Sequence, residues 1–220
     1  MYSSINRTET VKHIIIANVI FFVLFCTDFS PLYKMFPVLS LWYFDSPFFR
    51  PWQYITHFFM HGSFMHIFFN MYALYLFGTI LEQVWGAKRF IFFYFTTGII
   101  ASILYSLVAA IEYQITYGTM FPYSEGITSN IYVPMVGASG AIFGLLTAFG
   151  MLFPNTELRL LFPPIALKAK YFVLIYIALE LWLGFQQFSG DNVAHFAHIT
   201  GALVGFLLVK YWQKNSKTFY

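Results

Sequence analysis

The sequence predicts an all-α, polytopic membrane protein: a bundle of six transmembrane helices with an interfacial first loop. Hydrophobic residues make up 59% of the 220-residue chain and charged residues only 10%, which is too little charge to coat a surface that faces water. Six apolar runs approach the ~20 helical residues that cross a bilayer core. Lys and Arg gather in alternate connections between these runs. We expect one membrane domain, residues 1–220, with its core from 12 to 212.

The first three predicted helices are bounded by charges and turn residues. The first, residues 13–33, lies between two lysines. The second, residues 63–81, opens on Ser63, a residue type that favours the helix N-cap. The third, residues 90–111, contains no charged residue. Apolar runs of this length predict membrane spans.

The other three predicted helices carry the polar residues of greatest interest. Residues 136–153 follow a polar loop and open with two glycines that flank a serine. Residues 171–188 contain one acidic residue, Glu180. Residues 193–210 contain two histidines in their first two turns, His195 and His198. Ionisable groups inside a membrane are costly, so each of them indicates a functional site.

The positive charges predict the orientation, because Lys and Arg remain on the cytoplasmic side. With the N-terminus inside, the cytoplasmic set is Arg7, Lys12, Lys88, Arg89, Arg159, Lys168, Lys170, Lys210, Lys214 and Lys217, and the outer set is Lys34 and Arg50. Both termini are therefore expected in the cytoplasm. The short termini suit the bacterial cytoplasmic (inner) membrane.

Two outer connections differ in character. Residues 35–62 are aromatic and interrupted by proline, too apolar to extend into water and too broken to span. We expect them to lie at the membrane interface, where Trp and Tyr are favoured. Residues 112–134 are polar and rich in turn residues.

Composition and motifs exclude several chemistries. Cys26 is the only cysteine, so neither an intramolecular disulfide nor a CxxC metal site can form. The sequence has no HExxH zinc motif, no aspartate pair and no glycine-rich nucleotide motif, so we expect no metal and no cofactor. The net charge of +3 does not indicate nucleic-acid binding. Serine hydrolysis remains.

Four polar side chains are predicted at one depth in the bilayer. Counting ~1.5 Å per residue from the outer helix ends puts Ser139, His198, His66 and Asn70 roughly 4 to 11 Å below the outer surface. Ser139 is the predicted nucleophile and His198 its general base, since histidine is the usual base near neutral pH. The opposing interpretation is that Ser139 bonds only to its own helix backbone.

Small residues predict close contact between the fourth and sixth helices. Glycines four residues apart let two helix backbones approach each other, which would bring the serine and the histidine within hydrogen-bond reach. The two pairs are Gly140 with Gly144 and Gly201 with Gly205.

His66 and Asn70 are four residues apart and share a helix face. Both can donate hydrogen bonds to an oxyanion; a structural polar pair is the alternative. His61 and His195 are expected to have structural roles. Glu180 lies at a depth close to that of His198, so it could orient that imidazole as a third triad member, although a pair without an acid is simpler.

Three motifs resemble those of rhomboid intramembrane serine proteases. They are HGSFMHIFFN at 61–70, GASG at 137–140 and AHFAHITGALVG at 194–205, on the second, fourth and sixth helices. The resemblance covers about residues 51–210. It implies a Ser139–His198 dyad and an oxyanion hole that includes the backbone N–H of Ser139.

The resemblance also has implications outside the dyad. Gly137 and Gly140 would let the nucleophile stand at a helix start with open backbone donors. The loop before the second helix would match the family's membrane-embedded first loop, and the fifth helix would match its proposed lateral gate. The family often carries Trp-Arg where this chain has Trp52-Gln53, a departure that bears on how the loop is anchored.

The function indicated is a serine endopeptidase that cleaves transmembrane helices of other proteins near their outer ends. Its partners would be transmembrane protein substrates and the lipid bilayer; the oligomeric state is not indicated. One alternative is an inactive rhomboid-like protein that binds transmembrane clients. Another is a haem or metal protein with His66 and His198 as axial ligands.

Overall fold

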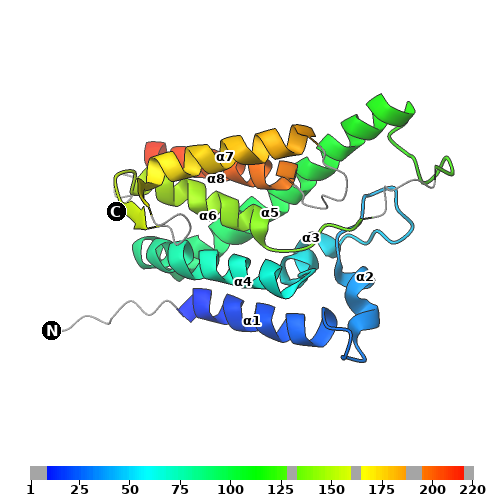
Figure 1. The fold of residues 1–220 in the computed structure, drawn as a ribbon, viewed down its shortest axis with the longest axis horizontal. Helices are drawn as coiled ribbons and strands as arrows, with labels where there is room; N and C mark the ends of the chain where they lie inside the picture. The colour runs from blue at the N-terminus through cyan, green and yellow to red at the C-terminus, as the bar shows by residue number, and fades with distance from the viewer. Residues whose placement is uncertain (1–8, 128–132, 160–164, 187–194, 216–220) are drawn as a thin grey trace.

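The computed structural model of the chain describes residues 9–127, 133–159, 165–186 and 195–215 (Figure 1), and helices dominate them. In chain order the elements are α1 (Glu9–Phe25), the 3-10 turn η1 (Tyr33–Met35), α2 (Phe36–Leu39), α3 (Gln53–Thr56), the 3-10 turn η2 (His57–Phe59), α4 (Phe64–Ala73), the π-helical turn η3 (Leu74–Gly78), α5 (Thr79–Tyr117), α6 (Ser139–Leu152), β1 (Glu157–Arg159), β2 (Ala166–Lys168), α7 (Ala169–Gln186) and α8 (His195–Asn215).

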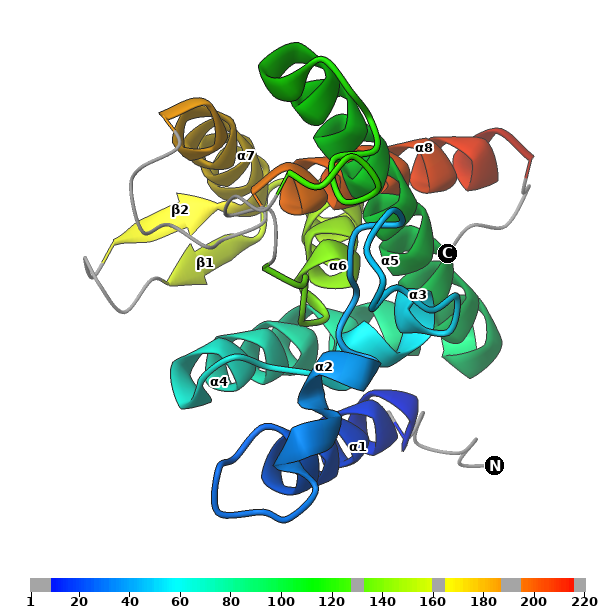
Figure 2. The ribbon, with the colours of Figure 1, turned by 90° about the vertical axis from the view of Figure 1, so that its right-hand side faces the viewer.

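Helix α6 lies at the centre of the molecule. It packs against α5, α7 and α8, which surround it in Figure 2. Nearly every residue from Ala141 to Leu152 is buried, as expected for a helix that is apolar on all sides. The first residue of α6 is therefore held by a rigid core.

The second and third predicted helices are continuous except for one break. Helix α4 continues through η3 into α5, and Gly86 interrupts α5 with φ 75° and ψ 161°. An L-residue with a side chain rarely adopts such a φ, so the glycine sets the position of the turn. The helical segments before and after Gly86 run in opposite directions (Figure 1). Helix α5 extends to Tyr117, six residues beyond the predicted end at 111.

Helix α1 differs from its predicted range of 13–33, because it begins at Glu9 and ends at Phe25. At its start, the buried carboxylate of Glu82 accepts hydrogen bonds from the backbone N–H groups of Thr10 and Val11, each at 3.0 Å. At its end, the Thr27 hydroxyl donates to the carbonyl of Val23. Side chains thus satisfy backbone groups near both described ends of α1.

Gln53 anchors the segment between α1 and α4. Its side chain is fully buried. The Oε1 atom accepts from the backbone N–H groups of Trp42 and Arg50, and the Nε2 atom donates to the carbonyls of Val38 and Phe48. All four hydrogen-bonding positions of the amide are used, so glutamine holds this loop together at the position where the family often has arginine.

A short antiparallel hairpin joins α6 to α7, which the all-α prediction did not include. Strands β1 and β2 pair with Glu157 opposite Lys168 and Arg159 opposite Ala166. Helix α7 begins two residues before the predicted 171, and α8 extends past 210 to Asn215. The predicted end at 188 and start at 193 lie outside the described residues.

Many apolar side chains face outward on the helices. A water-soluble protein rarely exposes so much contiguous apolar surface, and these positions are those that lipid would cover. One continuous helical stretch among the described residues, Phe64–Tyr117, is long and apolar enough by itself to cross a membrane. The exposed side chains include Ile16, Val19, Ile20 and Val23 on α1, Phe64, Phe68 and Phe69 on α4, and Leu174, Ile175, Leu179 and Phe185 on α7.

Candidate active site

Ser139 is the first residue of α6, with Ala138 in the N-cap position. The first N–H groups of a helix have no acceptor within the helix. They also carry the positive end of the helix dipole. The hydroxyl of Ser139 therefore lies beside backbone donors that can stabilise a developing negative charge.

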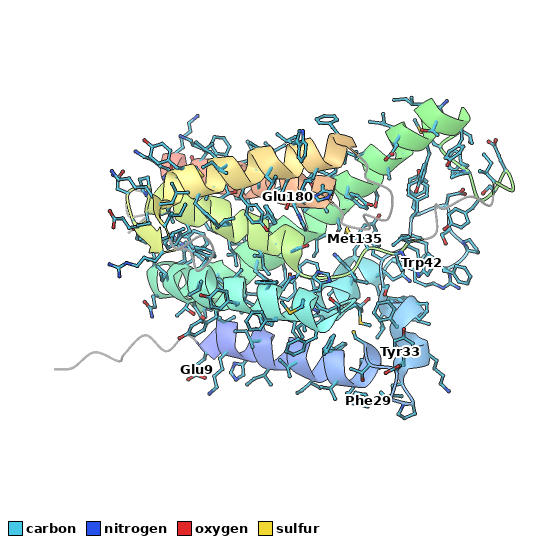
Figure 3. All side chains as sticks on the ribbon, viewed as in Figure 1. Glu9, Phe29, Tyr33, Trp42, Met135 and Glu180 are labelled. Atoms are coloured by element: carbon cyan, nitrogen blue, oxygen red, sulfur yellow. The ribbon has the colours of Figure 1, made fainter. Side chains whose placement is uncertain are left out.

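The segment that enters α6 is tied to the loop before α4. Met135, labelled in Figure 3, forms a two-way backbone bridge with Leu41, with N···O distances of 2.8 and 3.0 Å. The N–H of Gly137 donates to the carbonyl of His57 at 2.8 Å. These bonds fix the direction in which the chain enters the helix, and they explain why α6 begins at Ser139 rather than at the predicted 136.

Gly137 has φ +103°, in the region that favours glycine. A Cβ atom at this position would lie 2.7 Å from Nε2 of His66. Both the backbone conformation and the neighbouring imidazole therefore require glycine here.

The hydroxyl of Ser139 and the imidazole of His198 form a hydrogen bond, with Oγ 2.8 Å from Nε2. The contact depends on the close approach of α6 and α8. A Cβ on Gly201 would overlap the carbonyl group of Gly140, and one on Gly205 would lie 2.7 Å from the Cα of Gly144. The four glycines thus lie where the two backbones touch.

Phe143 fixes the plane of the His198 ring. The two rings stack with centroids 4.3 Å apart and an interplanar angle of 7°. Phe143 comes from α6, four residues after Ser139, so it shares the helix face of the serine. One helix therefore presents both the hydroxyl and the surface against which the imidazole packs.

The other ring nitrogen of His198 faces Glu180 of α7, which is labelled in Figure 3. Oε2 of Glu180 lies 2.9 Å from Nδ1 of His198 and 2.6 Å from Nδ1 of His195. Glu180 and His195 are both buried.

Among the described residues, these three side chains form the one group with a donor set suited to a metal ion, and their ligand atoms lie within 4.8 Å of one another. They are hydrogen-bonded to each other, so the network needs no ion to satisfy it. Both nitrogens of His198 are engaged, by Ser139 and by Glu180. The geometry therefore argues against His198 as an axial haem ligand.

His66 faces the start of α6 from α4. Ser63 is the predicted N-cap of this helix, and its side chain accepts from the backbone N–H of His66. Nδ1 of His66 accepts the N–H of Gly62 at 3.4 Å, which favours the tautomer with hydrogen on Nε2. Since Nε2 is the atom beside Gly137, His66 presents a donor on the side of the segment that leads into Ser139.

Asn70 is buried on α4, and its Nδ2 donates to the carbonyl of His66 at 2.9 Å. Its Oδ1 has no hydrogen-bond partner among the described residues. The structure thus ties Asn70 to its own helix and leaves its second N–H for another acceptor. The ring of His61 packs edge-on against that of His66, with centroids 5.0 Å apart.

A small cavity opens beside Ser139. It is lined in part by Ser139, His57, Gly98, Ser102, Met135 and Ala197. Ser102 and His57 give part of this wall a polar character, which suits a water molecule.

Sequence reasoning did not predict the stacking of Phe143 on His198, and it expected a structural role for His195 without naming a partner, although spacing signals were present. Phe143 stands four residues after Ser139, and His195 stands three before His198, so each pair lies on one helix face. The contact of Glu180 with His198 was one of two options, and its contact with His195 was not predicted, because both depend on the rotation of α7 about its own axis.

Comparisons with known proteins show which family the chain resembles. The profile described as "Rhomboid domain" matches residues 49–214. The chain is 31% identical over 159 residues to "Putative rhomboid protease YdcA" of Bacillus subtilis, covering 71% of this chain and 65% of that protein. It is 27% identical over 168 residues to "Rhomboid-like protein 19" of Arabidopsis thaliana, covering 76% of this chain and 50% of the relative.

A third relative is "Rhomboid protein 1, mitochondrial" of Saccharomyces cerevisiae, with 31% identity over 156 residues, which cover 71% of this chain and 40% of the relative. The chain thus matches between 40% and 65% of the length of these relatives. The profile match spans most of the chain and includes all the residues of the candidate site. The chain belongs to the rhomboid family.

Proposed function

We propose that the chain is an intramembrane serine endopeptidase that hydrolyses peptide bonds in or near the transmembrane helices of other proteins. The observation that carries the proposal is the 2.8 Å hydrogen bond between Oγ of Ser139 and Nε2 of His198. It lies at the start of a buried helix, where backbone donors are open. This combination of nucleophile, base and oxyanion donors is what acyl transfer requires.

The reaction proceeds in two steps. His198 takes the hydroxyl proton as Oγ of Ser139 attacks the scissile carbonyl carbon, and the resulting imidazolium gives the proton to the departing amine. The acyl-enzyme then reacts with a water molecule that His198 deprotonates, which releases the new carboxylate and restores the serine. The backbone N–H of Ser139 and Nε2–H of His66 stabilise the oxyanion in both steps, and the second N–H of Asn70 contributes to the same hole.

The proposed membrane arrangement is a single domain over residues 1–220 with six spans and both termini in the cytoplasm. Helix α1 begins and α8 ends on the same side of the molecule, and α6 runs towards that side (Figure 1). The Lys and Arg distribution supports placing that side in the cytoplasm. The candidate site then opens towards the outer surface, and we propose the bacterial cytoplasmic membrane as the location.

The substrate must unwind locally, because an intact helix hides its carbonyl groups in hydrogen bonds. Helix-weakening residues near the scissile bond would reduce that cost. We therefore expect cleavage where a transmembrane helix contains small or helix-breaking residues.

The test is cleavage of labelled transmembrane substrates by the purified protein in liposomes, comparing wild type with Ser139→Ala, His198→Ala and a control, His13→Ala. His13 is exposed on α1, so the control should cut normally. Both site variants should remain folded and lose activity. Equal cleavage by all four proteins would refute the proposal. Failure of the wild type on every substrate would favour the alternative, a rhomboid-like protein that binds transmembrane clients without cutting them.

A further inference from the structure

We propose that Glu180 and His195 form a positioning pair that holds His198 in its reactive tautomer. The Ser139–His198 dyad is thereby extended by two further hydrogen-bonded side chains, Glu180 and His195. The inference rests on the proposed function of the site. It concerns two residues that do not touch the substrate and act through the base.

The geometry joins two helices, α7 and α8, at one carboxylate oxygen. Oε2 of Glu180, from α7, lies 2.9 Å from Nδ1 of His198 and 2.6 Å from Nδ1 of His195. The two histidines are three residues apart and share a face of α8. The side chain of Glu180 is only 6% exposed and that of His195 only 9%, so water does not replace these bonds.

Glu180 determines which nitrogen of His198 carries the hydrogen. An ionised carboxylate only accepts hydrogen bonds, so a neutral His198 beside it carries its hydrogen on Nδ1. Nε2 then presents a lone pair to the hydroxyl of Ser139, 2.8 Å away, which is the form that a general base requires. The other tautomer would set two lone pairs against each other at Nδ1 and point an N–H at the serine, so it could not take the proton.

His195 holds the carboxylate in place. A buried carboxylate is costly unless hydrogen bonds compensate it, and His195 makes the shorter of the two histidine contacts with Oε2. It prevents the Glu180 side chain from rotating away from His198. When His198 accepts the serine proton, the carboxylate faces an imidazolium and stabilises the positive charge.

Other titratable groups lie around this cluster. Tyr176 of α7 is close enough to Glu180 to interact electrostatically, as is His66 of α4 with His198. Since both interact with the cluster, the pH profile of each variant is to be compared with the wild-type profile rather than with the titration of an isolated histidine.

The test measures kcat and KM against pH for Glu180→Gln and for a matched pair at position 195. Glu180→Gln keeps the shape and removes the charge. We expect kcat to fall roughly 10²- to 10⁴-fold, by analogy with loss of the orienting acid in other serine proteases, with KM within about threefold. The acid limb of the pH profile should move to lower pH than in the wild type, because the carboxylate no longer faces the imidazole.

The matched pair separates positioning from packing. His195→Asn keeps an N–H donor near the place of Nδ1, whereas His195→Leu fills the space without a donor. We expect His195→Asn to retain kcat within about threefold and His195→Leu to lose about tenfold, because only the leucine variant removes a hydrogen bond to a charged group. Rates are expressed per folded molecule, determined by thermal melting.

The outcomes distinguish this inference from the proposed function. Cleavage that needs Ser139 but has the wild-type kcat and acid limb in Glu180→Gln would overturn the positioning pair alone. Equal rates for His195→Asn and His195→Leu would overturn the role of His195, even if Glu180→Gln failed to fold. Cleavage that persists in Ser139→Ala would instead overturn the proposed function.

Discussion

At the scale of single residues, the site depends on a glycine as much as on the serine and the histidine. Gly137 combines a φ of +103° with the imidazole of His66 at the place where a Cβ would lie. The backbone donors of α6 and the Nε2–H of His66 can face one oxyanion only while the His66 ring lies directly against Gly137.

The first prediction concerns Gly137→Ala. The new Cβ would lie 2.7 Å from Nε2 of His66 and would add about 1–2 kcal/mol of backbone strain. We expect kcat to fall at least tenfold, because His66 is pushed away from the oxyanion. Gly118→Ala is the matched control, since Gly118 has φ 76° but no atom within 4 Å of its Cβ position. It should lose about 1 kcal/mol of stability and keep its activity. Equal kcat values for the two variants would contradict this account.

Sequence reasoning singled out Ser139, His198, His66 and Asn70 because their depth in the bilayer could be counted along each helix. It assigned Glu180 to the site only as one of several options. Depth along a helix follows from residue number, but rotation about the helix axis depends on packing, which a single sequence does not reveal. For the same reason the stacking of Phe143 was not predicted.

At the scale of elements, the contact between α6 and α8 sets the distance from the serine to its base. Backbone meets backbone at Gly140 and Gly201, and again at Gly144 and Gly205. Since nothing flexible lies between the helices, any added side chain must move one of them.

The second prediction is that Gly201→Ala separates the two helices. Overpacking of this kind typically costs 1–3 kcal/mol, and a shift of ~1 Å at the site can reduce the rate about 10²-fold. The melting temperature and kcat should therefore both fall. The control, Leu203→Ala, removes a side chain from an exposed position of α8 and should retain kcat. A Gly201→Ala enzyme with normal kcat would show that the close contact is not needed.

The third prediction concerns Glu82, which caps α1 from α5. Glu82→Ala leaves the N–H groups of Thr10 and Val11 without their acceptor, and we expect a loss of about 2 kcal/mol in the free energy of unfolding. The kcat of the folded fraction should stay near the wild-type value, because α1 does not contribute to the candidate site. Glu9→Gln, which removes one member of an exposed pair with Lys12 at 4.0 Å, should change stability by less than about 1 kcal/mol. Equal stability losses in both variants would contradict a capping role.

The helix boundaries show what a hydropathy pattern can and cannot predict. The existence of apolar helices followed from composition, but their ends depend on particular contacts. Glu82 accepts the N–H groups of Thr10 and Val11 in the first described turn of α1, and Gly86 sets the turn between the second and third predicted helices. Gly137 delays the start of α6. A sequence shows the glycines, but it does not show which of them adopt a positive φ.

At the scale of the whole molecule, the loop before α4 is linked to its neighbours through the backbone of two buried histidines. The carbonyl of His57 accepts the N–H of Gly137, and the N–H of His61 donates to Sγ of Cys26. Burial lowers the pKa of His57 to about 4, and burial together with the neighbouring His66 lowers the pKa of His61 to about 3. Both rings are neutral in the folded protein near neutral pH, whereas an unfolded chain has histidine pKa values of about 6.5.

The fourth prediction follows from the sign of these shifts. Below pH ~6.5 the unfolded chain binds protons that the folded chain excludes, so stability falls as pH falls, until about pH 4 for His57 and about pH 3 for His61. Each histidine should lower the free energy of unfolding by up to about 2 kcal/mol as the pH falls from 7 to 5. Thermal melting across this range should show a shallower pH dependence in His57→Gln/His61→Gln than in the wild type or in His13→Gln. Identical pH dependence of stability in the double variant, the wild type and His13→Gln would contradict this prediction.

Family membership, an apolar surface and a buried central helix agree at this scale with the fold class expected from composition. The resemblance in the three motifs is confirmed by the profile match over residues 49–214. The six-span arrangement and the orientation stay predictions, because they depend on a lipid environment that packing alone does not describe.

The most direct test of the central claim is covalent labelling of the nucleophile. The purified protein is treated with a fluorophosphonate, which reacts with activated serines, and the adduct is located by mass spectrometry of peptides. We predict one adduct, on Ser139, in the folded wild type, and none in His198→Ala or after denaturation. Labelling of a different serine, or equal labelling of Ser139 with and without His198, would show that this pair is not the catalytic centre.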